Sequence, residues 1–138
     1  MKVLVDTSVW CFALRKNVDP DNKIIKELFE LIHELRVAII GPIRQEILSG
    51  ISDQNKYEQL KEKLKSFEDA PIETEHYEFA AQLFNQCRKK GIQGSHIDFL
   101  ICAVSIKNDF SIFTLDKDFE KYKNHINIKL YKIRNDLL

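Results

Sequence analysis

The sequence predicts an α/β protein in which a central parallel sheet carries helices on both faces. Short apolar runs, typical of strands that are buried in such a sheet, occur at residues 2–5, 37–40, 112–114 and 126–133. Segments with helical patterns separate the runs, and parallel strands need crossover connections of this kind. No repeat, low-complexity segment or linker interrupts the 138 residues. We therefore expect one domain that spans residues 1–138.

The first strand should be followed by two helices. Residues 2–5 form a continuous apolar run, and Thr7 and Ser8 are suitable N-cap residues for a helix over residues 9–15. A longer helix should open at Asp19-Pro20, because proline suits the first helical position. Its apolar residues fall on one stripe that is expected to face the core: Ile24, Ile25, Leu28, Leu31, Ile32 and Leu35.

The second strand, residues 37–40, should end at Gly41-Pro42 and lead into a short helix over residues 43–49. Ser52 is the expected cap of a charged helix with an apolar edge, and Thr74 is the expected cap of another helix that ends near residue 91. Both helices read as amphipathic. The apolar edge of the first consists of Tyr57, Leu60, Leu64 and Phe67.

The remaining elements complete the sheet. A helix capped by Ser95 and running to about residue 107 is apolar nearly all round, which predicts that it is buried. Residues 112–114 form the next strand, and residues 117–122 form a short helix. Residues 126–133 alternate apolar and polar side chains, as expected of a strand at the edge of a sheet.

Composition excludes several classes of protein. Lys and Arg together number 21, as do Asp and Glu, so no excess of positive charge predicts nucleic-acid binding by the whole surface. Three cysteines without a CxxC pair (Cys11, Cys87 and Cys102) predict reduced core thiols rather than disulfides or a zinc site. No apolar run is long enough for a signal peptide or a membrane span. We expect a cytoplasmic protein that does not contact a membrane.

Four acidic residues occupy positions where they could meet. Asp6 and Asp116 follow strands, Glu46 lies in the helix after the second strand, and Asp98 lies in the first turn of the buried helix. In open α/β sheets, ligands bind beyond the carboxyl ends of the strands, so acids from distant segments can gather there. Each acid alone has an ordinary explanation, such as helix capping, a turn or a solvated surface. Their joint pattern is what favours a shared site.

Such a group of carboxylates needs a counter-charge. Two carboxylates about 4 Å apart repel by roughly 4 kcal/mol at an effective dielectric constant of 20. An all-oxygen acidic site suits Mg²⁺ or Mn²⁺ rather than zinc, and such an ion can activate water and stabilise a phosphoryl group. The residues therefore predict a magnesium-dependent hydrolase that acts on phosphodiester bonds.

Four stretches, VLVDTSVW, PIRQEILSG, GIQGSHIDFLICAVS and FTLDKDF, together resemble a family. In this order and spacing they are similar to PIN-domain ribonucleases, specifically the VapC-type toxins of toxin–antitoxin pairs, over nearly the full chain. The resemblance implies a three-layer α/β/α PIN-like fold and a metal-dependent endoribonuclease that binds Mg²⁺ or Mn²⁺ and cleaves RNA. It also implies a cognate antitoxin protein as partner, and a homodimer.

Carried over by position, the resemblance implies catalytic roles for Asp6, Glu46, Asp98 and Asp116, with Asp6, Asp98 and Asp116 as metal ligands. Ser8, Thr114 and Asp118 would act behind the ligands by orienting them or bound water. Capping explains Ser8 and Thr114 about equally well, and Asp118 is divided between the metal site and a helix start.

Several alternatives remain at this point. A phosphatase of the haloacid dehalogenase type wants a second Asp two residues after the first, where this chain has Ser8. A PIN nuclease outside a toxin–antitoxin pair, or a PIN-like domain that binds RNA or protein without cutting, shares the motifs. Candidate RNA contacts are Arg15, Arg44, the run of residues 88–90 and His96, but an ordinary surface role explains each of them better, so they are assigned no role.

Overall fold

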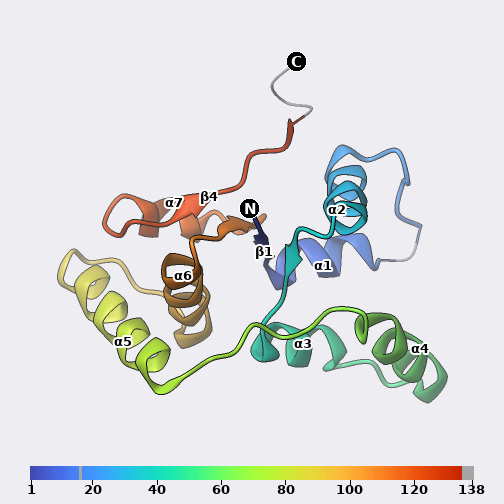
Figure 1. Cartoon of the computed structure of the whole chain (residues 1–138), viewed down its shortest axis with the longest axis horizontal. Coiled ribbons are helices and arrows are strands. Elements are labelled where there is room, and N and C mark those ends of the chain that lie inside the picture. Colours follow the sequence, from blue (N-terminus) through green and yellow to red (C-terminus); the bar gives the residue numbers. More distant parts are fainter. Residues whose placement is uncertain (16, 135–138) are drawn as a thin grey trace.

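The structure, a computed structural model, describes residues 1–15 and 17–134 (Figure 1). Within these residues four strands form one parallel sheet in the order β2-β1-β3-β4. The strands are β1 (Val3–Val5), β2 (Val37–Ala38), β3 (Ser111–Phe113) and β4 (Lys129–Leu130). Because all four run in the same direction, their carboxyl ends share one edge of the sheet. The predicted α/β fold with a central parallel sheet is confirmed.

Helices make up most of the chain between the strands. They are α1 (Thr7–Ala13), α2 (Lys23–His33), α3 (Gly41–Leu48), α4 (Gln54–Leu64), α5 (Thr74–Lys89), α6 (His96–Asn108) and α7 (Asp118–Lys123). In Figure 1, α5 lies beside α6 on one side of β1, and α1 lies with α2 on the other. None of the described helices combines the length and the apolarity needed to cross a membrane.

The core lies where the sheet meets α6. The three residues of β1 are fully buried, and α6 buries every residue from Phe99 to Ser105, as its all-round apolar sequence predicts. Trp10 is buried too and meets Phe67 edge to face, with 5.4 Å between the ring centroids. Cys87 and Cys102 are buried free thiols as expected, whereas Cys11 is exposed, so its assignment to the core was wrong.

Several helices begin at other residues than the pattern predicts. Asp6 rather than Thr7 or Ser8 is the N-cap of α1, because its extended backbone places its carbonyl in reach of the N–H groups of Val9 and Trp10. α2 begins at Lys23, after the prediction at Asp19-Pro20, since the Asn22 side chain accepts a hydrogen bond from the Ile24 N–H.

Three further boundaries move by one or two residues. Gly41 and Pro42 form the first turn of α3 instead of preceding it. Asp53, not Ser52, caps α4 by accepting from the N–H groups of Asn55 and Lys56. Thr74 is the first residue of α5, because Glu73 and His76 form a reciprocal capping box.

Two apolar residues behave differently from their patterns. Leu35, expected on the buried stripe of α2, is 84% exposed, because the helix ends at His33 and Leu35 adopts a positive φ of 59°. The last strand covers only Lys129–Leu130 rather than residues 126–133, although Ile126 and Ile128 are buried as the alternation predicts. β4 does lie at an edge of the sheet.

Candidate metal centre

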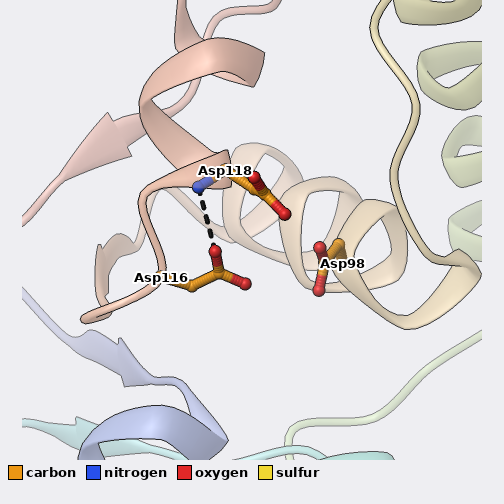
Figure 2. Close-up of side chains that lie close together, drawn as sticks. All are labelled: Asp98, Asp116 and Asp118. Carbon is orange, nitrogen blue, oxygen red and sulfur yellow. Dashed lines mark hydrogen bonds between the residues drawn. The ribbon is translucent and has the colours of Figure 1, made fainter.

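Three carboxylates meet at the carboxyl edge of the sheet. Asp98, Asp116 and Asp118 each present an oxygen, and these oxygens all lie within 4.8 Å of one another. Figure 2 shows the side chains pointing toward one another, Asp98 from α6, Asp116 from the loop after β3, and Asp118 from the start of α7. Carboxylates at this separation repel one another unless they are protonated or neutralised by a cation.

The loop after β3 is built by hydrogen bonds between its own side chains and backbone. The Thr114 hydroxyl accepts from the Asp116 N–H at 3.0 Å, and Asp116 Oδ1 accepts from the Asp118 N–H at 2.9 Å. These bonds turn the chain sharply after Phe113 and begin α7 at Asp118. The sequence left Asp118 divided between the metal site and a helix start. Both apply, because Asp118 is the first residue of α7 and also lies in the acidic group.

Asp98 reaches the group from the first turn of α6. The Ser95 hydroxyl accepts a hydrogen bond from the Asp98 N–H at 3.0 Å, as the predicted cap requires. The Asp98 carboxylate is half-buried, and its Oδ2 accepts a hydrogen bond from the Tyr122 hydroxyl at 2.7 Å. The helix cap thus sets the backbone, while Tyr122 contacts the carboxylate itself.

Asp6 lies directly beyond β1 and is buried, with 7% of its surface exposed. Its Oδ2 accepts hydrogen bonds from the Ser8 and Thr114 hydroxyls, each at 2.8 Å. β1 pairs with β3 so that Val5 lies opposite Phe113, which brings Asp6 and Thr114 side by side across the sheet. Asp6 is thus outside the group of three but next to it, and the Ser8 and Thr114 hydroxyls both donate to it.

Ser8 and Thr114 also link the two loops that leave β1 and β3. Their hydroxyl oxygens lie 3.3 Å apart, and the Ser8 hydroxyl accepts from the Leu115 N–H at 3.0 Å. Both hydroxyls therefore serve the loop structure and Asp6 at once. The capping and ligand-orienting explanations of these residues are compatible with each other.

The acids influence one another's ionisation. Partial burial raises the pKa of Asp98, and the Asp116 and Asp6 charges raise it further, while hydrogen bonds from Tyr122 and Ser95 act in the opposite direction. Glu46, an exposed residue of α3, has its pKa raised by desolvation and then by the charges of Asp6 and Asp98. Glu46 therefore faces the same negative region, although it contributes no oxygen to the group of three.

The remaining residues weighed from the sequence lie in ordinary structural surroundings. Arg44 holds α4: its guanidinium donates to the Leu64 carbonyl at 2.8 Å, to the Phe67 carbonyl, and to Asp69 Oδ1 at 3.0 Å. His96 is exposed and stacks on Phe84 with 5.1 Å between ring centroids. The sequence patterns did not single out Tyr122 as part of the site, because a tyrosine on a short helix reads as core.

The donor set fits a hard divalent cation. Every ligand atom of the group is a carboxylate oxygen, with no cysteine or histidine among the three residues. Mg²⁺ and Mn²⁺ prefer such oxygen ligands, whereas zinc sites draw on nitrogen and sulfur. The centre is therefore suited to a cation of the magnesium type.

Comparisons with known proteins identify relatives of the chain and solved structures that share its fold. Ribonuclease VapC11 of Mycobacterium tuberculosis and VapC ribonuclease Mb1587 of Mycobacterium bovis are each 27% identical to the chain over 136 residues, which cover 96% of this chain and 99% of each relative. The fold is shared with VapBC2 from Rickettsia felis bound to a promoter DNA fragment, at a TM-score of 0.75 and 21% identity, covering 95% of this chain and 98% of that one.

FitAcB from Neisseria gonorrhoeae shares the same fold, with a TM-score of 0.75 at 20% identity over 94% of this chain and 96% of the other. The family model described as the PIN domain matches residues 3–124, a range that contains the four predicted acids and Asp118. Because this match spans most of the sequence, the chain belongs to the PIN-domain family.

Proposed function

We propose that this chain is a metal-dependent endoribonuclease and the toxin component of a toxin–antitoxin pair. The observation that carries the proposal is the convergence of Asp98, Asp116 and Asp118 beside the buried Asp6, at the carboxyl edge of a parallel sheet in a PIN-domain chain. Full-length relatives at 27% identity are named as VapC ribonucleases, which supports RNA as the substrate.

The acids of the centre hold Mg²⁺ or Mn²⁺ in this proposal. Asp98, Asp116 and Asp118 would supply ligand oxygens, and Asp6, buried beside them, would be a further ligand. When bound, such an ion lowers the pKa of a coordinated water and stabilises negative charge on a phosphoryl oxygen. A cation held by these carboxylates would fix where the scissile phosphate can approach, because the acids alone repel the negatively charged RNA backbone.

The other residues of the site orient and transfer protons. Ser8 and Thr114 donate to Asp6 Oδ2 and so leave its other oxygen, Oδ1, as the one aimed at ligands. Glu46 lies beside the acids without joining their group, and desolvation together with the Asp6 and Asp98 charges raises its pKa, so we assign it to proton transfer.

The partners follow from the same assignment. Solved structures that share the fold include DNA-bound VapBC from Salmonella typhimurium. By analogy this chain binds a small cognate antitoxin and acts as a homodimer in the cytoplasm, where cellular RNA is its substrate.

The activity is tested with purified protein and single-stranded RNA. Wild type should cleave internally with Mg²⁺ or Mn²⁺ and not in excess chelator. Asp98→Asn and Asp116→Asn should each lower the rate by about 100-fold or more, because a bound metal contributes several kcal/mol to the transition state.

Asp109→Asn is the matched control. Asp109 lies at the other end of α6, pairs with Lys129 and has a positive φ of 57°, which asparagine tolerates well. This variant should cleave at the wild-type rate. Cleavage that survives chelation, or full activity of both site variants, would contradict the proposal.

The toxin role needs a cellular measurement. Induced expression should arrest growth, whereas Asp98→Asn should not, and the product of a small adjacent reading frame should restore growth when expressed together with it. RNA cleavage in vitro without growth arrest would instead favour a nuclease outside a toxin–antitoxin pair. Binding of RNA without any cleavage would favour a PIN-like binding domain.

A further inference from the structure

The backbone alone does not fix the orientation of the Asp98 carboxylate. The Ser95 hydroxyl caps the Asp98 N–H and lies beside its carboxylate, but a contact within the same helical turn does not by itself set how the carboxylate faces the other two acids. Asp116 and Asp118 lie opposite it and repel it when all three are ionised. A donor is therefore needed to hold the carboxylate toward its neighbours.

Tyr122 supplies that donor from α7. Its hydroxyl donates to Asp98 Oδ2 at 2.7 Å, and the residue as a whole is fully buried. The Tyr122 ring packs against Phe99, with 4.8 Å between the ring centroids, and against Phe119, with 5.2 Å between them. A ring packed in this way has little freedom to move its hydroxyl away from Asp98.

Gly94 leaves the space that the hydroxyl occupies. A Cβ atom at this position would lie 2.3 Å from the Tyr122 hydroxyl oxygen, 2.7 Å from Tyr122 Cζ and 2.8 Å from Phe99 Cε2. The loop before α6 therefore closes over Tyr122, and any side chain there would displace it. Three separate elements, α6, α7 and this loop, thus define one position for the hydroxyl.

The Tyr122 hydroxyl is the donor in this hydrogen bond, because an ionised carboxylate oxygen can only accept. A buried tyrosine hydroxyl is often merely satisfied by any nearby acceptor. Here the acceptor is a carboxylate of the candidate metal centre, so removal of the hydroxyl should change metal binding, which can be measured.

We propose that Tyr122 is a positioning residue for the metal centre, whose hydroxyl holds Asp98 in the orientation that faces Asp116 and Asp118. This inference rests on the proposed function. Tyr122 contacts neither substrate nor cation. It acts through Asp98, as residues behind metal ligands do, and loss of such a partner typically weakens metal binding by about 10- to 100-fold.

The test is direct Mn²⁺ binding by calorimetry, with cleavage measured as a function of Mn²⁺ concentration. Tyr122→Phe keeps the ring and removes one oxygen. It should bind Mn²⁺ about 10- to 100-fold more weakly than wild type. Its kcat at saturating Mn²⁺ should recover most of the wild-type value, because the hydroxyl sets how readily the site forms rather than the chemical step.

Tyr131→Phe is the matched control. Tyr131 is a partly buried tyrosine that packs on Phe113 and whose hydroxyl lies near Glu27. It should bind Mn²⁺ and cleave RNA as wild type does. Unchanged or tighter Mn²⁺ binding by folded Tyr122→Phe would overturn the inference, whereas a wild type that neither binds Mn²⁺ nor cleaves RNA would overturn the proposed function itself.

If Tyr122→Phe does not fold, wild-type protein still tests the inference. A Mg²⁺ titration followed by NMR of the tyrosine ring carbons should shift the Tyr122 resonances with the half-saturation measured by calorimetry, and leave those of Tyr57 on α4 unchanged. Tyr122 resonances that do not respond to bound Mg²⁺ would overturn it.

Discussion

At the scale of single residues, the site depends on groups that the acids contact as much as on the acids. Asp6 accepts hydrogen bonds from two hydroxyl groups. Asp116 accepts one from the Asp118 N–H, and Asp98 accepts one from the Tyr122 hydroxyl. Each of these three carboxylates is thus held by a different kind of donor. The hydrogen bond from Tyr122 to Asp98 depends on Gly94, because a side chain there would occupy the place of the Tyr122 hydroxyl.

Gly94→Ala should destabilise the protein. The new methyl group would overlap Tyr122 and Phe99, and overpacking of this kind costs about 1–3 kcal/mol of the free energy of unfolding. Urea denaturation followed by circular dichroism measures it. Gly41→Ala is the control, because a Cβ there meets only Asp69 Oδ2 at 4.0 Å, and equal stability of the two variants would contradict the packing argument.

At the scale of elements, the connections between helices explain residues that the sequence left without a role. Arg44 on α3 donates to the carbonyls of Leu64, the last residue of α4, and of Phe67 after it, and pairs with Asp69. A bridge also joins Ile39 to Asp69 beside β2. Arg44 therefore ties the segment after α4 to α3, while the bridge ties it to the sheet, and the Arg44 guanidinium is occupied by protein contacts rather than by RNA.

Arg44→Ala should lower the free energy of unfolding by about 1–3 kcal/mol, because the two carbonyls lose a charged donor. Cleavage by the folded fraction should stay at the wild-type rate. Thermal unfolding and RNA cleavage at a temperature well below the transition measure the two effects separately. Arg88→Ala, at the exposed end of α5, should change neither, and a large loss of RNA affinity in Arg44→Ala with unchanged stability would reverse this assignment.

At the scale of the whole molecule, balanced charge hides a strongly uneven distribution. The net charge is zero, yet acids from β1, α3, α6 and the loop after β3 gather at one edge of the sheet. Their repulsion is a cost of the metal-free fold, and a bound cation removes it. Elsewhere buried charge is compensated: Glu27 is held by Arg134, with Oε1 2.8 Å from Nη2.

The stability of the metal-free protein should therefore depend on pH in a defined direction. The pKa values of Asp98 and Glu46 are raised, so the folded state binds protons more tightly than the unfolded state, and the free energy of unfolding rises as pH falls from neutral toward the carboxylate range. Burial alone would raise the pKa of Glu27, but hydrogen bonds from Arg134 outweigh it and lower the pKa. The stability that ionised Glu27 contributes is therefore lost only at more acidic pH. Stability should peak at mildly acidic pH.

Urea denaturation in chelator between neutral and acidic pH measures this dependence. Asp98→Asn should flatten the rise, whereas Asp109→Asn should keep it. Saturating Mg²⁺ should reverse the trend, because it stabilises the fold by about 2.7 kcal/mol at 100 times its Kd and protons compete with it. A free energy of unfolding that falls steadily as the pH is lowered from neutral, in chelator, would contradict the repulsion argument.

The sequence by itself determined the class of fold and the place of the site. Buried apolar runs alternating with helical segments are local patterns, and an acid directly after a parallel strand must lie at the carboxyl edge, as Asp6 and Asp116 do. The Ser95 cap of α6 was equally predictable, since capping involves residues within one turn.

Only the tertiary structure decided which of these side chains meet. Asp118 joins Asp98 and Asp116 through the turn at Thr114, and Tyr122 reaches Asp98 from another helix, contacts that depend on the packing of α6 against α7 and the loop at Gly94. Leu35 and Arg44 show the same dependence. The pattern placed Leu35 in the core, but α2 ends before it and the side chain is exposed. The pattern left Arg44 on the surface without a partner, but the path of the chain after α4 brings carbonyls to its guanidinium. Long-range contacts of this kind leave no periodic trace in a sequence.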